Sequence, residues 1–278
     1  MTSRINYGST VLALLLIAGW VSPSVQAAED DQAAMKSDKT GTNPINFRND
    51  VRLYNEFSWL NTAGDGDQNV STLEIRTPFA DDKWQFRVRA RAMDIGADTN
   101  NDGVDELNDS GFGDLDFRFL TVPYLDMAKK MAFVVGFETF LDTASENVLG
   151  TGTTSFGPQA FLVFFTPFGI KGSLFAPAYQ HKFSVDEAAG RSEISQGLID
   201  LFFLKQSKDK LRWALIDPQI ILDYETNTEY MLLDIELGTM LDPYLNTKGH
   251  SAYIRPALGV GQYRPVDYAI EVGYKVIW

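Results

Sequence analysis

The chain has no cysteine and only two histidines, His181 and His250. The lack of cysteine excludes disulfide bonds and thiol chemistry. Two histidines without an H-E-x-x-H arrangement do not suit a zinc site. A Ser–His hydrolase also needs an orienting third group and an oxyanion donor, and no pattern for either is recognisable. We therefore predict no catalytic residues, and the chain is not expected to be an enzyme.

Positive charge is also scarce. Lysine and arginine number 24 against 37 aspartates and glutamates, which gives a net charge of −13. Such a surface repels the phosphate backbone, because nucleic-acid binding relies on clustered Lys and Arg. Nucleic acid is therefore excluded as a partner.

Long apolar runs are missing after the first 27 residues. Residues 1–27 have the features of a secretory signal peptide, with Arg4, an apolar core over 11–21 and small residues suited to cleavage after Ala27. No later stretch approaches the ~18 apolar residues that a membrane-spanning helix needs. Any membrane span must therefore be built from strands. Residues 28–44 are small, polar and unpatterned, and they are expected to form a flexible leader before a single domain over 45–278.

Two-residue periodicity is abundant instead. In the last eleven residues, Tyr268–Trp278, every even position is apolar or aromatic, and the odd positions are small or charged apart from Ile277. Similar segments recur along the chain at lengths that suit transmembrane strands. Twelve strands are expected, at 46–59, 70–79, 83–95, 112–122, 131–141, 155–166, 172–183, 193–204, 211–223, 230–241, 250–262 and 268–278. The last strand is expected to pair with the first to close the sheet, with Glu271 and Lys275 pointing inward.

The connections between these segments favour a membrane barrel over a soluble one. Short connections alternate with longer ones, as in barrels with tight periplasmic turns and larger outer loops. A soluble lipocalin-like barrel would share the alternation with its faces inverted. Strand number and length, loop asymmetry, the signal sequence and Trp278 favour an all-β, antiparallel, up-and-down transmembrane barrel. Its expected location is the outer membrane of a Gram-negative cell, in contact with membrane lipid, and no pattern defines an oligomeric state.

Prolines interrupt four of the expected strands. A proline cannot donate a hydrogen bond to a neighbouring strand, so bulges or shorter strands are expected around it. The seventh and ninth strands are the least regular on this ground. The four prolines are Pro158, Pro177, Pro218 and Pro256.

One face of the first four strands is strongly charged. Arginine on the lipid side of a barrel would cost roughly 2–4 kcal/mol per residue near the midplane, so this face is expected to line the lumen. The predicted pore-lining residues are Asp50, Arg52, Glu74, Arg76, Arg87, Arg89, Arg91, Asp114, Asp116 and Arg118. They form either a constriction that orients solutes or a salt-bridge network that holds a narrow lumen closed. The opposite wall is thinner in charge and mostly acidic, with Glu138, Asp200, Asp217, Asp223, Asp234, Glu236, Arg255, Glu271 and Lys275 as its charges.

The segment after the third strand contains a candidate calcium loop. Asp98, Asn100, Asp102, Gly103 and the Val104 carbonyl fit D-x-[DN]-x-[DN]-G, and Asp109 stands where an EF-hand loop carries its last ligand. Aspartate is shorter than the usual glutamate there, and no flanking helices are expected. The same residues are also typical of a solvated hairpin loop. A structural calcium ion is therefore a candidate, and no other cofactor is expected.

Two glycine-rich stretches resemble a known family. Residues 110–115, Ser-Gly-Phe-Gly-Asp-Leu, resemble its G-x-G-D-L strand opening. Residues 149–152 with 155–158 resemble its G-T-G … P block. Both are similar to the Gram-negative outer-membrane family named after the meta-pathway of phenol degradation. The resemblance implies an outer-membrane transporter, with small hydrophobic or aromatic compounds as candidate solutes, and it brings no catalytic residues.

Together these patterns predict an outer-membrane channel for small-molecule solutes. The alternative is a closed barrel with a salt-bridged lumen that serves a structural, ligand-binding or partner-binding role. A soluble periplasmic β-protein is a third possibility.

Overall fold

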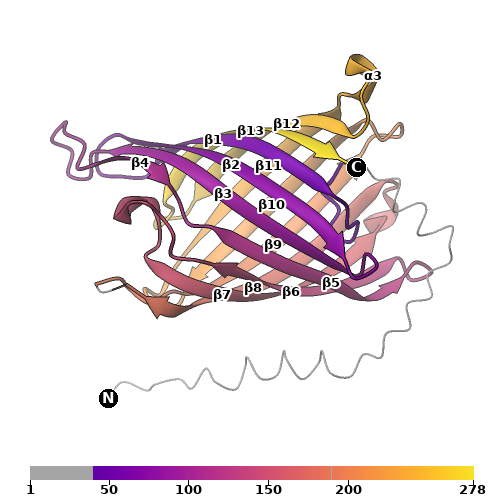
Figure 1. The fold of residues 1–278 in the computed structure, drawn as a ribbon, viewed down its shortest axis with the longest axis horizontal. Coiled ribbons are helices and arrows are strands. Elements are labelled where there is room, and N and C mark those ends of the chain that lie inside the picture. The colour runs from indigo at the N-terminus through magenta and orange to yellow at the C-terminus, as the bar shows by residue number, and fades with distance from the viewer. Residues whose placement is uncertain (1–39, 189) are drawn as a thin grey trace.

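The computed structural model describes residues 40–188 and 190–278. The predicted signal peptide (1–27) and residues 28–39 of the predicted leader lie outside the described residues. The described chain forms a closed antiparallel barrel of tilted strands (Figure 1). No helix in the described part of the chain is long and apolar enough to cross a membrane.

The strands follow one another around the barrel in sequence order. They are β1 (Asp50–Leu60), β2 (Gly66–Phe79), β3 (Trp84–Ala97), β4 (Leu107–Phe112), β5 (Asp116–Asp126), β6 (Met131–Phe140), β7 (Thr153–Phe165), β8 (Ser173–Glu187), β9 (Ser195–Gln206), β10 (Arg212–Asp223), β11 (Thr228–Met240), β12 (His250–Val260) and β13 (Val266–Ile277). β4 and β5 pair with successive parts of β3 and share one place in the wall, so the barrel has twelve strands.

The first and last strands close the barrel, as the sequence predicted. β1 pairs with β13 along its length, with Arg52 opposite Lys275 and Glu56 opposite Glu271. An open sheet edge would leave backbone donors and acceptors unpaired, which a membrane does not tolerate. We call the end of the barrel that holds Asp50 and Ile277 the turn end and the opposite end the loop end. Two short 3-10 helices, η1 (Asn147–Leu149) and η2 (Pro167–Gly169), and one helical turn, α3 (Asp242–Leu245), lie in the connections.

The prolines do not shorten the strands, contrary to expectation. Between β9 and β10, pairing stops after Ile216 and Phe203 and resumes at Gln219 and Asp200 in the same register. Pro158, Pro177 and Pro256 likewise lie at gaps of two residue pairs without a register shift. Each proline interrupts the pairing with one adjacent strand only. Pairing with the other adjacent strand is continuous. The seventh and ninth expected strands, which are β8 and β10 in the structure, are therefore complete.

The fourth expected strand, 112–122, is divided in two. The break falls at Gly113–Leu115, between β4 and β5. A side chain at Gly113 would meet the sulfur of Met93 at 2.4 Å, and one at Gly111 would meet Ser145 Oγ at 2.1 Å. These glycines allow the chain to pass close to its neighbours, and the wall is interrupted there.

The barrel is apolar outside and charged inside. Large exposed side chains on the strands are aliphatic or aromatic, including Leu53 (59% exposed), Leu237 (52%) and Val272 (50%). Charged side chains are buried, with Lys275 and Glu236 fully so. Soluble proteins show the reverse, and transmembrane barrels have this apolar outer band. The soluble β-protein is therefore excluded in favour of an outer-membrane-type barrel.

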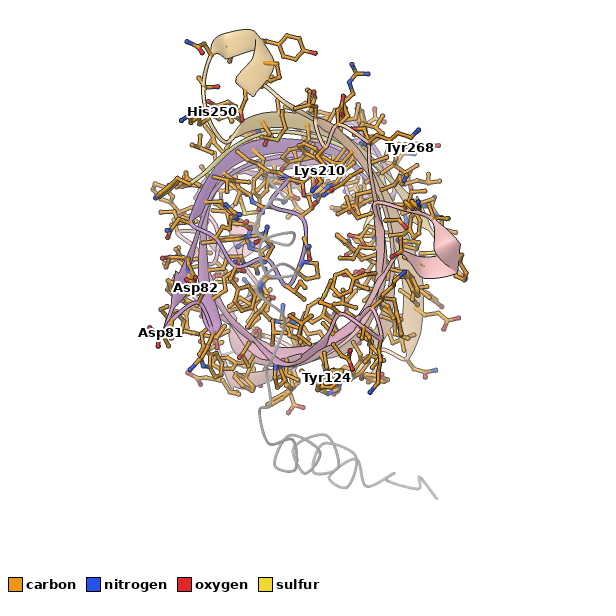
Figure 2. The ribbon with its side chains drawn as sticks, turned by 90° about the vertical axis from the view of Figure 1, so that its right-hand side faces the viewer. Asp81, Asp82, Tyr124, Lys210, His250 and Tyr268 are labelled. Carbon is orange, nitrogen blue, oxygen red and sulfur yellow. The ribbon has the colours of Figure 1, made fainter. Side chains whose placement is uncertain are left out.

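The first strand begins later than predicted, at Asp50 instead of residue 46. Residues 40–48, which we call the lumen segment, fold into the barrel instead of extending β1. Ile45 belongs to a buried apolar cluster with Leu120, Val134, Leu215 and others, and Gly41 O accepts a hydrogen bond from Arg52. Residues 40–44 of the predicted leader are thus packed against the barrel, because the neighbouring Ile45 is buried in the apolar cluster inside the turn end. Figure 2 looks into this end and shows side chains projecting into the lumen.

Candidate functional site

Strand register arranges the charged face in two rows. The first row runs from Lys275 on β13 through Arg52, Glu74 and Arg89 to Asp116 on β5. The second runs from Asp50 through Arg76, Arg87 and Arg118 to Glu138 on β6. Residues opposite one another on adjacent strands are near enough to interact. The second row places three arginines side by side, and their repulsion must be offset by carboxylates.

Glu74 is the carboxylate at the centre of the first group. Its Oε1 lies 2.6 Å from Arg76 Nε and 3.3 Å from Arg52 Nε. Arg52 Nε also lies 2.9 Å from Asp50 Oδ1. All four side chains are largely buried, so these charges depend on one another for compensation.

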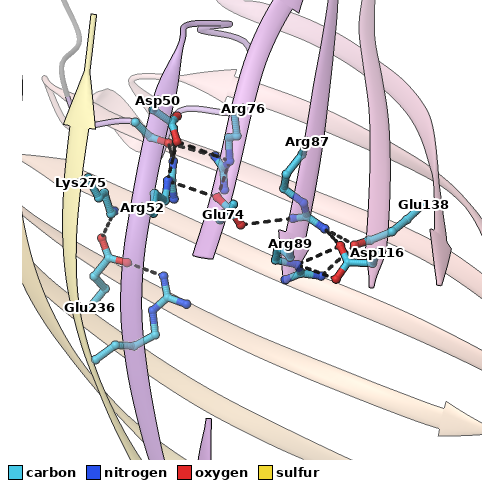
Figure 3. A network of polar contacts seen from close by, with 12 residues as sticks. Asp50, Arg52, Glu74, Arg76, Arg87, Arg89, Asp116, Glu138, Glu236 and Lys275 are labelled. Atoms are coloured by element: carbon cyan, nitrogen blue, oxygen red, sulfur yellow. Dashed lines mark hydrogen bonds and ion pairs between the residues drawn. The ribbon is translucent and has the colours of Figure 1, made fainter. Parts of the chain in front are cut away.

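Asp116 and Glu138 hold the second group (Figure 3). Arg87 and Arg89 contact both carboxylates, with Arg89 Nη2 2.8 Å from Glu138 Oε1. Arg91 Nη2 lies 2.5 Å from Asp116 Oδ2. Glu138 belongs to this network, although the sequence placed it on the opposite wall. Its register with Arg118 brings it here, and no sequence pattern reports the register of one strand against the next.

Arg118 differs from the other arginines. It lines the central cavity, but it forms no ion pair with the residues that the structure describes, and its buried Nε has no hydrogen-bond partner. Its neighbours in the row are Arg87 and Glu138, and Glu138 is already bound by Arg87 and Arg89. Arg118 therefore has no carboxylate of its own among the described residues.

Asp114 does not join the arginines through its side chain. Its carboxylate accepts hydrogen bonds from the backbone N–H groups of Thr143, Ala144 and Thr151, and its backbone oxygen accepts one from Arg91. The break between β4 and β5 turns this side chain toward the β6–β7 loop. Asp114 therefore orders an outer loop, whereas the other nine predicted pore-lining residues belong to the two rows or adjoin them.

The opposite wall carries carboxylates with few donors. Asp217 on β10 lies directly across from Asp234 on β11, and Asp200 on β9 is opposite Gln219. Gln219 Nε2 donates to Asp217 Oδ2 at 3.3 Å and to Asp234 Oδ2 at 3.2 Å. Asp200 Oδ1 and Asp217 Oδ1 are buried and accept no hydrogen bond from the described residues. We call Asp200, Asp217 and Asp234 the acidic trio.

The basic side chains nearest this wall are already paired. Arg255 binds Glu236 and lies 3.8 Å from Glu271. Lys275 Nζ lies 3.1 Å from Glu236 Oε1, which also accepts a 2.6 Å hydrogen bond from Trp213 Nε1. The acidic trio therefore has no cation of its own among the described residues.

Both walls face one cavity of about 670 Å³. Arg52, Glu74, Arg76, Arg87, Arg89, Arg91 and Arg118 line it from one side, and Asp200, Asp217 and Gln219 line it from the other. Its apolar lining includes Phe140, Phe161, Phe202 and Leu215. Ligand pockets are commonly ~300–1,000 Å³. The barrel thus encloses a space large enough for a small organic molecule.

The candidate calcium loop has a different geometry from the predicted one. The Asp98 carboxylate accepts hydrogen bonds from four backbone N–H groups, those of residues 100–103. Asp102 and Glu106 bring carboxylate oxygens within 4.8 Å of it. Asp109 is not in this group, because it lies in β4 opposite Ile95. The Val104 N–H donates to Asp102, and the Asn100 N–H donates to Asp98. Calcium binding stays a prediction.

Two solved outer-membrane barrels are similar to this chain in fold. An outer-membrane channel from Pseudomonas putida F1 is similar with a TM-score of 0.66 and 10% identity, over 84% of this chain and 96% of that one. A NanC porin is similar with a TM-score of 0.55 and 12% identity, over 82% of this chain and 98% of that one. No family model and no curated protein matches the sequence. The likeness is one of fold, and the resemblance to the phenol-degradation family stays a prediction.

Proposed function

We propose that the protein is a channel for small solutes in the outer membrane of a Gram-negative cell. The observation that carries this proposal is the cavity of about 670 Å³ enclosed by the barrel and lined by charged and polar side chains. A lumen filled only for stability would not need such a space, and fixed charges around a cavity can attract and orient a solute. The similarity in fold to an outer-membrane channel and a porin supports the same function.

Small hydrophobic or aromatic compounds are candidate solutes. The resemblance to the phenol-degradation family suggests them, and Phe140, Phe161 and Phe202 give the cavity apolar contact surface. Aromatic side chains provide large contact areas for flat apolar groups.

Conductance of the refolded protein in a planar bilayer tests the channel function. Discrete current steps are expected from protein whose folding is shown by heat-modifiable gel mobility. A silent bilayer with correctly folded protein would contradict the proposal. Fractionation with outer membranes and resistance to alkaline extraction test the location.

A closed structural barrel is the second candidate, and the buried ion pairs around Glu74, Asp116 and Glu138 favour it. Replacing Arg87, Arg89 and Arg91 together by serine separates the two functions. In a channel, removing three positive charges from the cavity wall shifts ion selectivity toward cations. Unchanged selectivity combined with a large loss of stability would favour the closed barrel.

A further inference from the structure

The two walls of the cavity carry opposite uncompensated charges. Among the described residues Arg118 on β5 has no ion-pair partner, and on the other wall the single amide of Gln219 donates to Asp217 and Asp234 but not to Asp200. β5 and β11 are six strand positions apart in both directions around the barrel, so Arg118 and Asp234 lie on opposite sides. The lumen therefore has a transverse electric field between them.

The acidic trio is costly for the empty barrel. Like charges directly opposite on adjacent strands are destabilising, and Asp217 faces Asp234 in this way. Asp217 is only 7% exposed and its Oδ1 accepts no hydrogen bond from a described residue. Buried polar groups normally have partners, so a cation or donor supplied from outside the chain would complete this wall.

A second unpartnered group points to the same cavity. Gln159 on β7 is 9% exposed, lines the cavity, and its Nε2 donates to no described residue. The unused amide donor of Gln159, on β7 midway between β5 and β9, and the guanidinium of Arg118 suit an anionic or carbonyl group. Unused carboxylates on the other side suit an ammonium group.

We propose that the cavity binds zwitterionic solutes, whose cationic amine is held by Asp200 and Asp217 and whose anionic group is held by Arg118. This inference rests on the proposed function and specifies its solute class. The apolar lining between the walls accommodates the body of such a molecule. A solute with both charges gains from the field at both ends, whereas a solute with one charge meets an unfavourable wall.

Isothermal titration calorimetry of the full chain in detergent at low salt tests the proposal without requiring conduction. The probes are 6-aminohexanoate, which carries both charges, hexanoate, which carries the negative one, and hexylamine, which carries the positive one. We expect 6-aminohexanoate to bind about tenfold more tightly than either single-charge probe. Equal binding of hexylamine or of hexanoate would overturn the proposal, and so would no binding of any probe.

Two variants locate the charges. Arg118→Gln is expected to weaken 6-aminohexanoate to the level of hexylamine without weakening the binding of hexylamine. Asp217→Asn is expected to weaken both amines and to raise the unfolding temperature, because it removes the repulsion with Asp234. Asp209→Asn, in the β9–β10 turn, is the matched control and should change neither the affinity for the amines nor the unfolding temperature. A loss of stability in Asp217→Asn with unchanged amine binding would contradict the site.

Failure of the proposed binding site and failure of the proposed channel function give different experimental outcomes. Zwitterion binding by a protein that conducts no current would contradict the proposed channel function and support the proposed binding site. Current steps from a protein that binds none of the three probes would contradict the proposed binding site and support the proposed channel function.

Discussion

Glu236 shows how a single buried residue joins several strands. It is fully buried on β11 and contacts Trp213 on β10, Arg255 on β12 and Lys275 on β13. Removing one partner of a buried charge pair leaves the other without compensation and typically costs about 3–5 kcal/mol. The residue therefore contributes to stability through the groups that it neutralises.

Glu236→Ala is accordingly expected to lower the free energy of unfolding by about 3–5 kcal/mol. Urea-induced unfolding in detergent, followed by tryptophan fluorescence, measures the change. Asp126→Ala is the control, because its pair with Lys129 is exposed on the lysine side and should contribute far less than the buried Glu236 contacts. Similar losses in the two variants would contradict the role given to Glu236.

Glu106 gives a pH-dependent signal in the β3–β4 loop. The Thr99 backbone N–H donates to Glu106 Oε2 at 2.6 Å and the Thr99 hydroxyl donates at 2.8 Å. These two hydrogen bonds hold the pKa of Glu106 below its ordinary value of 4.5, and the backbone hydrogen bond has the larger effect. Because the pKa is lowered in the folded state, the stabilisation is present above pH 4.5 and is lost as the pH falls through the folded value.

The amide resonance of Thr99 should therefore titrate with a midpoint below 4.5 in an NMR pH series on the protein in micelles. Glu106→Gln should abolish the step, because the amide does not ionise in this range. A midpoint at or above 4.5 would show that the hydrogen bond does not favour the carboxylate.

At the scale of the strands, two glycines make room for inward aromatic rings. Trp213 lies opposite Gly238, and Tyr253 lies opposite Gly273. A side chain at Gly273 would come within 2.2 Å of the Tyr253 ring, and one at Gly238 within 2.0 Å of the Trp213 ring. Each ring covers the backbone of the next strand and fills space that the glycine leaves empty.

Gly273→Ala is expected to destabilise the barrel by about 1–3 kcal/mol, because the Tyr253 ring must move in a packed interior. The midpoint of heat-modifiable gel mobility reports the change. Gly96→Ala is the matched control, since a side chain there meets only Asp105 Oδ2, at an ordinary 3.4 Å. Equal effects in the two strands would show that the ring contact is unimportant.

The strands themselves were predictable from sequence, because two-residue periodicity sets which side chains face inward. The pairing of β1 with β13 and the inward direction of Glu271 and Lys275 followed from closure. The register between strands was not predictable. The register places Arg118 between Arg87 and Glu138, where it has no ion-pair partner among the described residues, and it brings Glu138 to the arginines. Asp114 was misplaced because the break at Gly113–Leu115 depends on close contacts with distant residues.

At the scale of the whole molecule, the two halves of the lumen have different interiors. The charged rows line one side of the cavity, and a buried apolar cluster lies toward the turn end, including Ala132, Leu174, Leu204 and Met240. Ile45 of the lumen segment packs into this cluster. Gly41 O accepts hydrogen bonds from Arg52 and Arg76, which belong to the charged rows. The lumen segment thus contacts both halves and occupies part of the lumen.

Ile45 is the side chain of the lumen segment that belongs to the buried apolar cluster, so Ile45→Asp should release the segment. Burial of an isoleucine contributes about 1.5–3 kcal/mol, and an unpaired carboxylate in the same apolar site costs several kcal/mol more. A short segment with a few hydrogen bonds cannot offset this loss, so it should leave the lumen. Single-channel conductance should rise relative to the unaltered protein, whereas Asn101→Asp, which adds the same charge in an exposed loop, should not change it. Unaltered conductance in Ile45→Asp would mean that the segment does not limit the path.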